Sequence, residues 1–269
     1  MQNRQLNKAE IRLIQSRARE KQIEYCKMND IIGSSVFSIL EKENKVLYYP
    51  LEDQQVWGFS ERIRGESFVC INTSLAYDKQ VFAAAHELYH VWFGGDKGEI
   101  MISKDAQEPD SDEEIELYAN RFAAEFLVNE ELLRQEMKVF EIDKDRLTIK
   151  EIVKLANLFV VPYKTMVKRL FEAEILSKKD FEKFMTLTNE QVDIWRNRLG
   201  LSVPIRKDKI GLSNLIDMAM DLYEKKMITY EKLEYLLEFG GLMPEDMGVE
   251  KENVYRIPTD EELDAIMEE

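Results

Sequence analysis

The sequence predicts an α+β protein in which a small sheet comes early in the chain and helices make up most of the remainder. Three short segments, rich in β-branched and aromatic residues and separated by polar turns, predict the strands. They are VLYYPL (46–51), QVWGF (55–59) and ESFVCIN (66–72). Elsewhere, apolar residues recur at helical spacing between capping and stop signals. Hydrophobic residues form 45% of the 269-residue chain, which is enough for a sizeable core.

Two helices flank the predicted strands. The amphipathic spacing of residues 8–27 predicts the first. Asp78 is a suitable N-cap for a helix over 79–93, and the glycine pair that starts at Gly94 ends it. The next segment, GDKGEIMISKDAQEPDSDEE, is acidic, shows little pattern and predicts a loop. Within it, Ser111 and a glutamate three residues later form a capping box, which opens a helix that runs to about residue 128.

The second half of the chain predicts helices alone. A helix starts at Glu130, and residues 147–184 are helical with a break at the Val161-Pro162 pair. A shorter helix covers about 189–199. After a linker, SVPIRKDK, the chain forms a helical hairpin over about 212–239 and ends in an acidic tail.

Composition narrows the class of function. The formal net charge is −15, and such a field repels phosphate backbones, so we do not expect direct nucleic-acid binding. No window approaches the run of about 20 apolar residues that spans a membrane, and the first residues show no secretory pattern. The two cysteines, Cys26 and Cys70, are far apart, as expected of reduced thiols. These features predict a cytoplasmic protein without a membrane partner.

The segment His86-Glu87-Leu88-Tyr89-His90 carries the strongest chemical signal. Residues four apart on a helix differ by about 40° and lie one turn apart, so two imidazoles can hold one tetrahedral metal ion. Glu87 lies on the adjacent flank, where it can accept a proton from a water molecule that the metal acidifies. This is the content of an HExxH signature, with His86 and His90 as zinc ligands and Glu87 as the catalytic base.

A simpler interpretation is two histidines on a half-buried helix face with a surface glutamate between them. An HExxH segment arises by chance in a chain of this length at a rate on the order of one per cent. These are the only two histidines in the chain, however, and both fall in the motif. Phe82, Ala85, Tyr89 and Trp92 form an apolar stripe beside it, which predicts a core helix whose inward polar groups need a partner.

The third metal ligand has to be a carboxylate or, less readily, a cysteine, because no histidine remains. The helix opened by Ser111 offers Asp112, Glu113 and Glu116 on related faces. Glu116 is favoured because it lies inside the helix, whereas the first turn frays. Its face, which includes Ala119, is small and semi-polar, as expected where two helices approach closely. The alternative is that each acid is simply a solvated side chain at the N-terminus of a helix, where the helix dipole favours negative charge.

Taken together, three segments resemble the ImmA/IrrE family of metallopeptidases. The segments are VCIN, VFAAAHELYHVWF and ELYANRFAAEFLV, within about residues 45–135. The positions that match the family pattern are Asn72, His86, Glu87, His90, Glu116, Ala119, Asn120, Phe122, Ala123 and Ala124. The resemblance implies a zincin-like catalytic domain, in which a small sheet packs on the HExxH helix and a second ligand helix. It also implies that Glu116 is the third ligand of a gluzincin-type site that binds Zn²⁺, with Mn²⁺ as an alternative.

The resemblance further implies the partner. Members of the family are similar to proteases that cleave a transcriptional repressor, often of a phage or mobile element, or that act in a stress response. The segment EIVKLANLFVVPYKTMVKRLFEAEIL is similar to the family's helix-turn-helix-like region. It departs from a DNA-binding module, because Val160 stands where a turn glycine is usual and Pro162 opens the second helix. Its candidate recognition helix offers Lys164, Lys168 and Arg169.

The predicted organisation therefore has three parts. Residues 1–140 form the zincin-like domain with its N-terminal helix, 141–200 the helix-turn-helix-like region, and 201–269 the hairpin and acidic tail. The predicted reaction is hydrolysis of a peptide bond, and the strand 66–72 would offer its edge to an extended substrate. Candidate phenols for an oxyanion are Tyr77, Tyr89 and Tyr118.

Two rival functions remain open at this point. One is a non-proteolytic regulator that keeps the metal as a scaffold and binds a protein, and the other is a DNA-binding regulator. Glu87 counts against the first, because a purely structural site has no use for that residue. The net charge counts against the second. The oligomeric state is left open.

Overall fold

The computed structural model describes residues 5–63, 66–94, 101–104, 113–143, 147–201 and 211–251. The chain divides into two compact units, residues 1–213 and 214–269, and each is described by itself. The predicted linker at 202–209 and the tail beyond 251 lie outside the described residues, and the three-part division stays a prediction. In the described part, no helix is long and apolar enough to cross a membrane.

The first unit contains a five-stranded sheet with the order β4-β2-β3-β1-β5. Its strands are β1 (Lys45–Tyr49), β2 (Val56–Ile63), β3 (Glu66–Asn72), β4 (Met101–Lys104) and β5 (Gly211–Leu212). The pair β1–β3 is parallel, and the other pairs are antiparallel. Because β3 is paired on both sides, the prediction that it offers a free edge to substrate is wrong. Strands β4 and β5 were not predicted, since β4 falls in the acidic segment and β5 lies between the linker and the hairpin.

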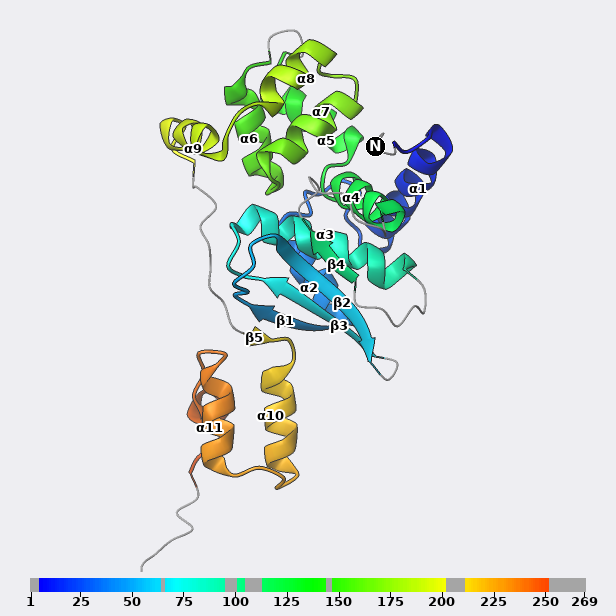
Figure 1. Cartoon of the computed structure of the whole chain (residues 1–269). Helices are drawn as coiled ribbons and strands as arrows, with labels where there is room; N and C mark the ends of the chain where they lie inside the picture. Colours follow the sequence, from blue (N-terminus) through cyan, green and yellow to red (C-terminus); the bar gives the residue numbers. More distant parts are fainter. Residues whose placement is uncertain are drawn as a thin grey trace, which may run out of the picture. The chain divides into compact units, whose positions relative to one another are not determined.

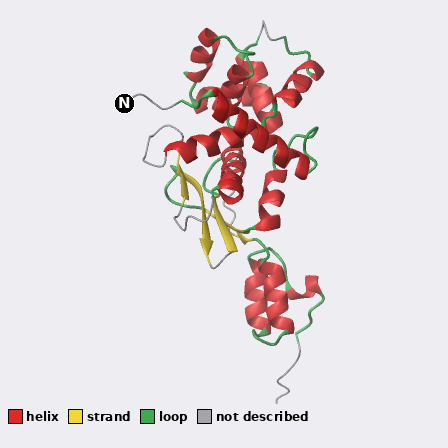
Figure 2. Ribbon diagram, turned by 90° about the vertical axis from the view of Figure 1, so that its right-hand side faces the viewer, coloured by secondary structure: helices red, strands yellow, loops and turns green. Residues whose placement is uncertain are grey.

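Nine helices are described in the first unit. They are α1 (Lys8–Glu24), α2 (Ser35–Glu43), α3 (Tyr77–Phe93), α4 (Glu113–Leu127), α5 (Glu130–Val139), α6 (Ile149–Phe159), α7 (Tyr163–Glu172), α8 (Lys178–Met185) and α9 (Asn189–Arg198). All were predicted except α2, although α7 and α8 were predicted as one continuous helix. The α+β class is thus confirmed, with α3 packed on the sheet and α6 to α8 lying away from it (Figures 1 and 2).

Strand alternation decides which face of the sheet the helices cover. Val46, Val69 and Ile71 are buried in the core, whereas Leu47 and Tyr49 on the opposite face of β1 are exposed. Helix α3 packs on β2 and β3 with one side and on α4 with the other, so it lies between the sheet and α4 (Figure 1). The polar side chains that α3 buries, such as His86 and Glu87, therefore need internal partners.

Helix α3 begins slightly earlier than predicted, with Ala76 as its N-cap. Asp78 is therefore not the cap but lies in the first turn, where it is buried. Its carboxylate accepts a hydrogen bond from the guanidinium of Arg196 on α9, at 3.0 Å. Burial raises the pKa of Asp78, and the charge of Arg196 opposes that rise. A partner 118 residues away thus holds a side chain that the local pattern assigns to a cap.

Helices α6 and α7 form the predicted helix-turn-helix-like pair, but the second helix faces inward. Val160 ends α6 in the left-handed conformation with φ 55°, a conformation in which glycine is usual. The buried side chains of α7 are Tyr163, Met166, Val167, Arg169 and Leu170. Of the three basic residues in the candidate recognition helix, Arg169 is therefore internal, and Lys168 alone is exposed.

The second unit is the predicted helical hairpin. Helices α10 (Leu215–Glu224) and α11 (Tyr230–Glu238) pack on each other, and a short 3-10 helix, η2 (Pro244–Met247), contacts α11. Its fully buried apolar residues are Ala219, Leu233 and Leu237. So small a core gives the hairpin little independent stability.

Candidate metal centre

Helix α3 brings the two histidines of the chain together. His86 and His90 are one turn apart on the buried part of the helix, with 1% and 6% of their surfaces exposed. Their Nε2 atoms lie 3.0 Å from each other. The spacing of the HExxH motif therefore produces the expected convergence of two imidazole nitrogens.

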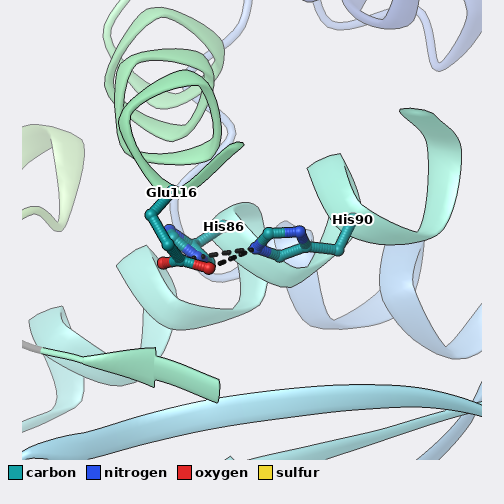
Figure 3. A group of neighbouring side chains, drawn as sticks. All are labelled: His86, His90 and Glu116. Carbon is teal, nitrogen blue, oxygen red and sulfur yellow. Dashed lines mark hydrogen bonds and ion pairs between the residues drawn. The ribbon is translucent and has the colours of Figure 1, made fainter. Parts of the chain in front are cut away.

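Helix α4 supplies a carboxylate to the same point. The Oε2 atom of Glu116 lies 3.2 Å from His86 Nε2, and its Oε1 atom lies 3.3 Å from His90 Nε2. Figure 3 shows the three side chains meeting from the two helices. Ala119 and Ala123 on the same helix are fully buried. Such small side chains let two helices approach closely, which brings Glu116 within reach of α3.

The spacing of these atoms fits a tetrahedral ion. Ligand atoms 2.0–2.1 Å from a tetrahedral metal lie about 3.3 Å apart, close to the distances between the nitrogens and the carboxylate oxygens. Within the described residues, His86, His90 and Glu116 form the group that could hold a metal ion. Asp112 and the side chain of Glu113, the other predicted acids, lie outside the described part.

The charge state of Glu116 also suits a ligand. Burial alone would raise the pKa of its carboxyl, but hydrogen bonds with His86 and His90 and the charge interaction with both imidazoles lower it to about 2. The side chain is therefore an anion near neutral pH, the form in which a carboxylate binds a metal.

Asn120 orients the first histidine. It lies one turn after Glu116 on α4, and its Oδ1 atom is 3.1 Å from His86 Nδ1. With the amide oxygen as acceptor, Nδ1 carries the proton of His86, and the lone pair of Nε2 points toward Glu116 and His90. Asn120 matches the family pattern, but no role was predicted for it from the sequence. Its position four residues after Glu116, on the same helix face, was the signal for one.

We expect Asn120→Ala to weaken metal binding by about 10–100-fold, because His86 loses the partner that fixes its tautomer and ring orientation. Asn120→Asp keeps an oxygen acceptor and should retain most of the affinity. Competition with a chromogenic zinc chelator measures the change, and Asn157→Ala on α6 is the matched control. Wild-type affinity in Asn120→Ala would remove this role from the residue.

Glu87 is fully buried on α3, one residue after His86. Two of the three candidate phenols, Tyr89 and Tyr118, have hydrogen-bond partners other than the site, and the role of Tyr77 stays a prediction. The hydroxyl of Tyr89 accepts a hydrogen bond from Arg17 at 2.9 Å, and that of Tyr118 donates to Glu114 at 3.3 Å. These bonds leave the oxyanion role of either phenol without support.

A small sheet, two helices that present two imidazoles and a carboxylate, and a glutamate beside the first histidine define a site of the metallopeptidase class. The comparison with protein families agrees. Residues 41–171 match Peptidase_M78, the IrrE N-terminal-like domain. This part of the chain belongs to the ImmA/IrrE family, which confirms the resemblance. The match reaches beyond the motifs into α7. No match emerges from the comparison with curated proteins.

Proposed function

We propose that the protein is a zinc-dependent endopeptidase that cleaves a specific partner protein in the cytoplasm. The observation that carries this proposal is the convergence of His86, His90 and Glu116 at distances that fit one tetrahedral ion. Glu87, directly after the first of these residues, adds a group with a use in hydrolysis. A metal that served only as a scaffold would not need it.

Each of the four residues has a distinct role in this proposal. His86, His90 and Glu116 hold the metal, and their atoms already lie together in the described part of the chain. Zn²⁺, or Mn²⁺ in its place, supplies Lewis acidity that lowers the pKa of water and polarises a peptide carbonyl. Glu87 accepts the proton of the attacking water and passes it to the leaving amine. Burial of Glu87 keeps bulk water away from this proton transfer.

The proposed substrate is a helix-turn-helix transcriptional repressor, which places the protein among anti-repressors or stress-response regulators. The family supports a protein substrate, and the net charge of −15 supports a basic one. DNA-binding proteins carry basic surfaces, and an acidic protease attracts them over a distance of about 10 Å at moderate salt. Cleavage of the repressor would release the genes that it silences.

The alternative is a metal-bearing regulator that acts by binding protein or DNA without cleavage. One observation argues against DNA binding. Arg169 of the candidate recognition helix is 1% exposed and donates hydrogen bonds to Glu125, so it cannot contact DNA in this conformation. The net charge adds a second obstacle. A protein-binding regulator would hold the metal equally well, and only cleavage separates it from the endopeptidase.

Metal content tests the first half of the proposal. Purified wild-type protein is expected to hold close to one Zn²⁺ per chain. His90→Ala and Glu116→Gln each remove one of three ligands, so both should lose most of the metal after dialysis against a weak chelator. Elemental analysis by mass spectrometry measures the stoichiometry.

Glu114→Gln is the matched control for Glu116→Gln, because it removes a charge from an exposed position of the same helix. It should keep the wild-type zinc content. Wild-type protein that takes up no metal would contradict the peptidase assignment and leave a binding protein. Metal that stays in Glu116→Gln would move the third ligand to another residue.

A further inference from the structure

A glycine of the sheet lies beneath the proposed catalytic glutamate. Gly58 on β2 pairs with Ile71 of β3, whose side chain is fully buried, so position 58 faces the same inward side. Helix α3 packs on β2 on that side. A residue with a side chain at position 58 would therefore point it at α3, the helix that carries Glu87.

The space for that side chain is already filled by Glu87. A Cβ atom added at Gly58 would lie 3.2 Å from Glu87 Oε1 and 3.3 Å from Glu87 Cγ. It would also lie 2.9 Å from the main-chain oxygen of Cys70. Distances this short are tighter than almost all real Cβ contacts, so any other residue would displace the carboxylate or the strand.

The backbone conformation does not require glycine here, so the reasons for glycine are the two contacts, with Glu87 and with the main-chain oxygen of Cys70. Gly58 is not among the residues with positive φ, so its φ is not in the region that favours glycine. Glycine within a strand also weakens the strand, and it often marks a point where another group approaches closely. Gly58 also follows a bulge in β2. Val56 pairs with Lys104 of β4 and Gly58 pairs with the adjacent Ser103, so the residue between Val56 and Gly58 has no partner in the register of β4.

One ring contact holds the strand, and one electrostatic effect is consistent with a carboxylate near it. The ring of Trp57 meets Phe82 of α3 edge-on, with ring centroids 5.9 Å apart, so β2 is packed against α3 immediately before Gly58. Burial first, and then the negative charge of Glu87, raise the pKa of the Cys70 thiol to about 11. The charge of Glu87 therefore reaches β3, the strand beside Gly58.

We propose that Gly58 is a positioning residue, whose missing side chain sets where the carboxylate of Glu87 lies against the sheet. This inference rests on the proton-transfer role of Glu87 in the proposed function. The histidines and Glu116 approach from the helices and make no use of this space. Crowding at position 58 should therefore disturb Glu87 and leave metal binding intact.

A double-mutant cycle on thermal stability tests the contact without any substrate. Gly58→Ala is expected to lower Tm by roughly 3–9 °C, the shift that corresponds to overpacking in a protein of this size. In the Glu87→Ala background, the Cγ and carboxylate are absent, and the same substitution should lower Tm by a smaller amount, which is the part due to the main-chain oxygen of Cys70. Differential scanning fluorimetry of the four full-length proteins measures both shifts.

Val46→Ala on β1 is the control, because its fully buried side chain lies two strands away from β2. Its Tm shift should be the same with and without Glu87. If Gly58→Ala fails to fold, recovery of folding in the double variant supports the proposal. Equal shifts in both backgrounds, or an unfolded double variant, would overturn it, because the contact with the main-chain oxygen of Cys70 would then account for the glycine.

A second measurement separates positioning from general damage. Gly58→Ala should keep the wild-type zinc content while cleavage of the substrate falls at least tenfold in kcat, with KM little changed. Loss of zinc together with activity would overturn the positioning role. A wild-type protein that cleaves nothing would contradict the proposed function, whereas the outcome of the stability cycle is independent of cleavage.

Discussion

Glu87→Gln is expected to reduce cleavage of the partner protein by a factor on the order of 10²–10⁴ while zinc content stays at the wild-type value. Glutamine has nearly the shape of glutamate, so the buried site keeps its packing, but the amide cannot accept a proton from water. The three groups proposed as ligands are unchanged. Cleavage of a co-expressed helix-turn-helix repressor, followed by mass spectrometry of the fragments, measures the loss, and the inactive variant can capture the intact substrate.

Glu114→Gln again provides a matched control, since it removes a carboxylate from an exposed site and should cleave at the wild-type rate. Cleavage that survives Glu87→Gln would show that another group accepts the proton. Loss of zinc in Glu87→Gln would instead mean that the residue supports the fold of the site. Failure of the wild type to cleave any repressor would favour the non-proteolytic regulator.

The part of the site that lies on one helix could be predicted from sequence alone. His86 and His90 are brought together by helical periodicity, which is a local property of the chain. Glu116 comes from another helix, and residue patterns only narrowed the choice among three acids. The family resemblance favoured Glu116, because a motif records helix contacts that periodicity cannot reveal.

Pairing in the sheet could not be predicted in the same way. The segment 66–72 is a strand with the predicted ends, yet its place in the centre of the sheet was missed. Strand neighbours are set by contacts between distant segments, and alternation alone does not say how many edges are covered. Strand β4 was missed because its four residues lie in a polar, acidic segment without a strand pattern.

Two charged residues have long-range partners that could not be predicted, for a related reason. Asp78 has the residue type and position of an N-cap, and Arg169 lies where a recognition helix offers a basic side chain. Each is held by an ion pair with a residue far along the chain, Arg196 and Glu125 respectively. Local patterns describe what a residue can do, whereas its distant partner decides which of these interactions forms.

The Arg169 pair leads to the largest expected effect on stability. Arg169 on α7 donates to both carboxylate oxygens of Glu125 on α4, at 2.9 and 2.7 Å, and to the carbonyl oxygen of Val128 at 3.1 Å. Arg169→Leu leaves the buried carboxylate of Glu125 with Arg121 as its remaining charged partner, and the loss should cost about 3 kcal/mol of unfolding free energy. Denaturant unfolding of the full-length protein measures the change.

Arg19→Leu is the matched control, because Arg19 forms an exposed pair with Glu131 at 3.7 Å. Exposed pairs contribute less than about 1 kcal/mol, so this variant should be nearly as stable as wild type. The double variant Arg169→Leu/Glu125→Leu should recover part of the loss, since no unpaired charge remains. Equal losses of unfolding free energy in Arg169→Leu and Arg19→Leu would show that the Arg169 pair does not stabilise the packing of α7 on α4. Because Glu125 and Glu116 share helix α4, a confirmed effect would mean that α7 braces the helix of the metal centre instead of reading DNA.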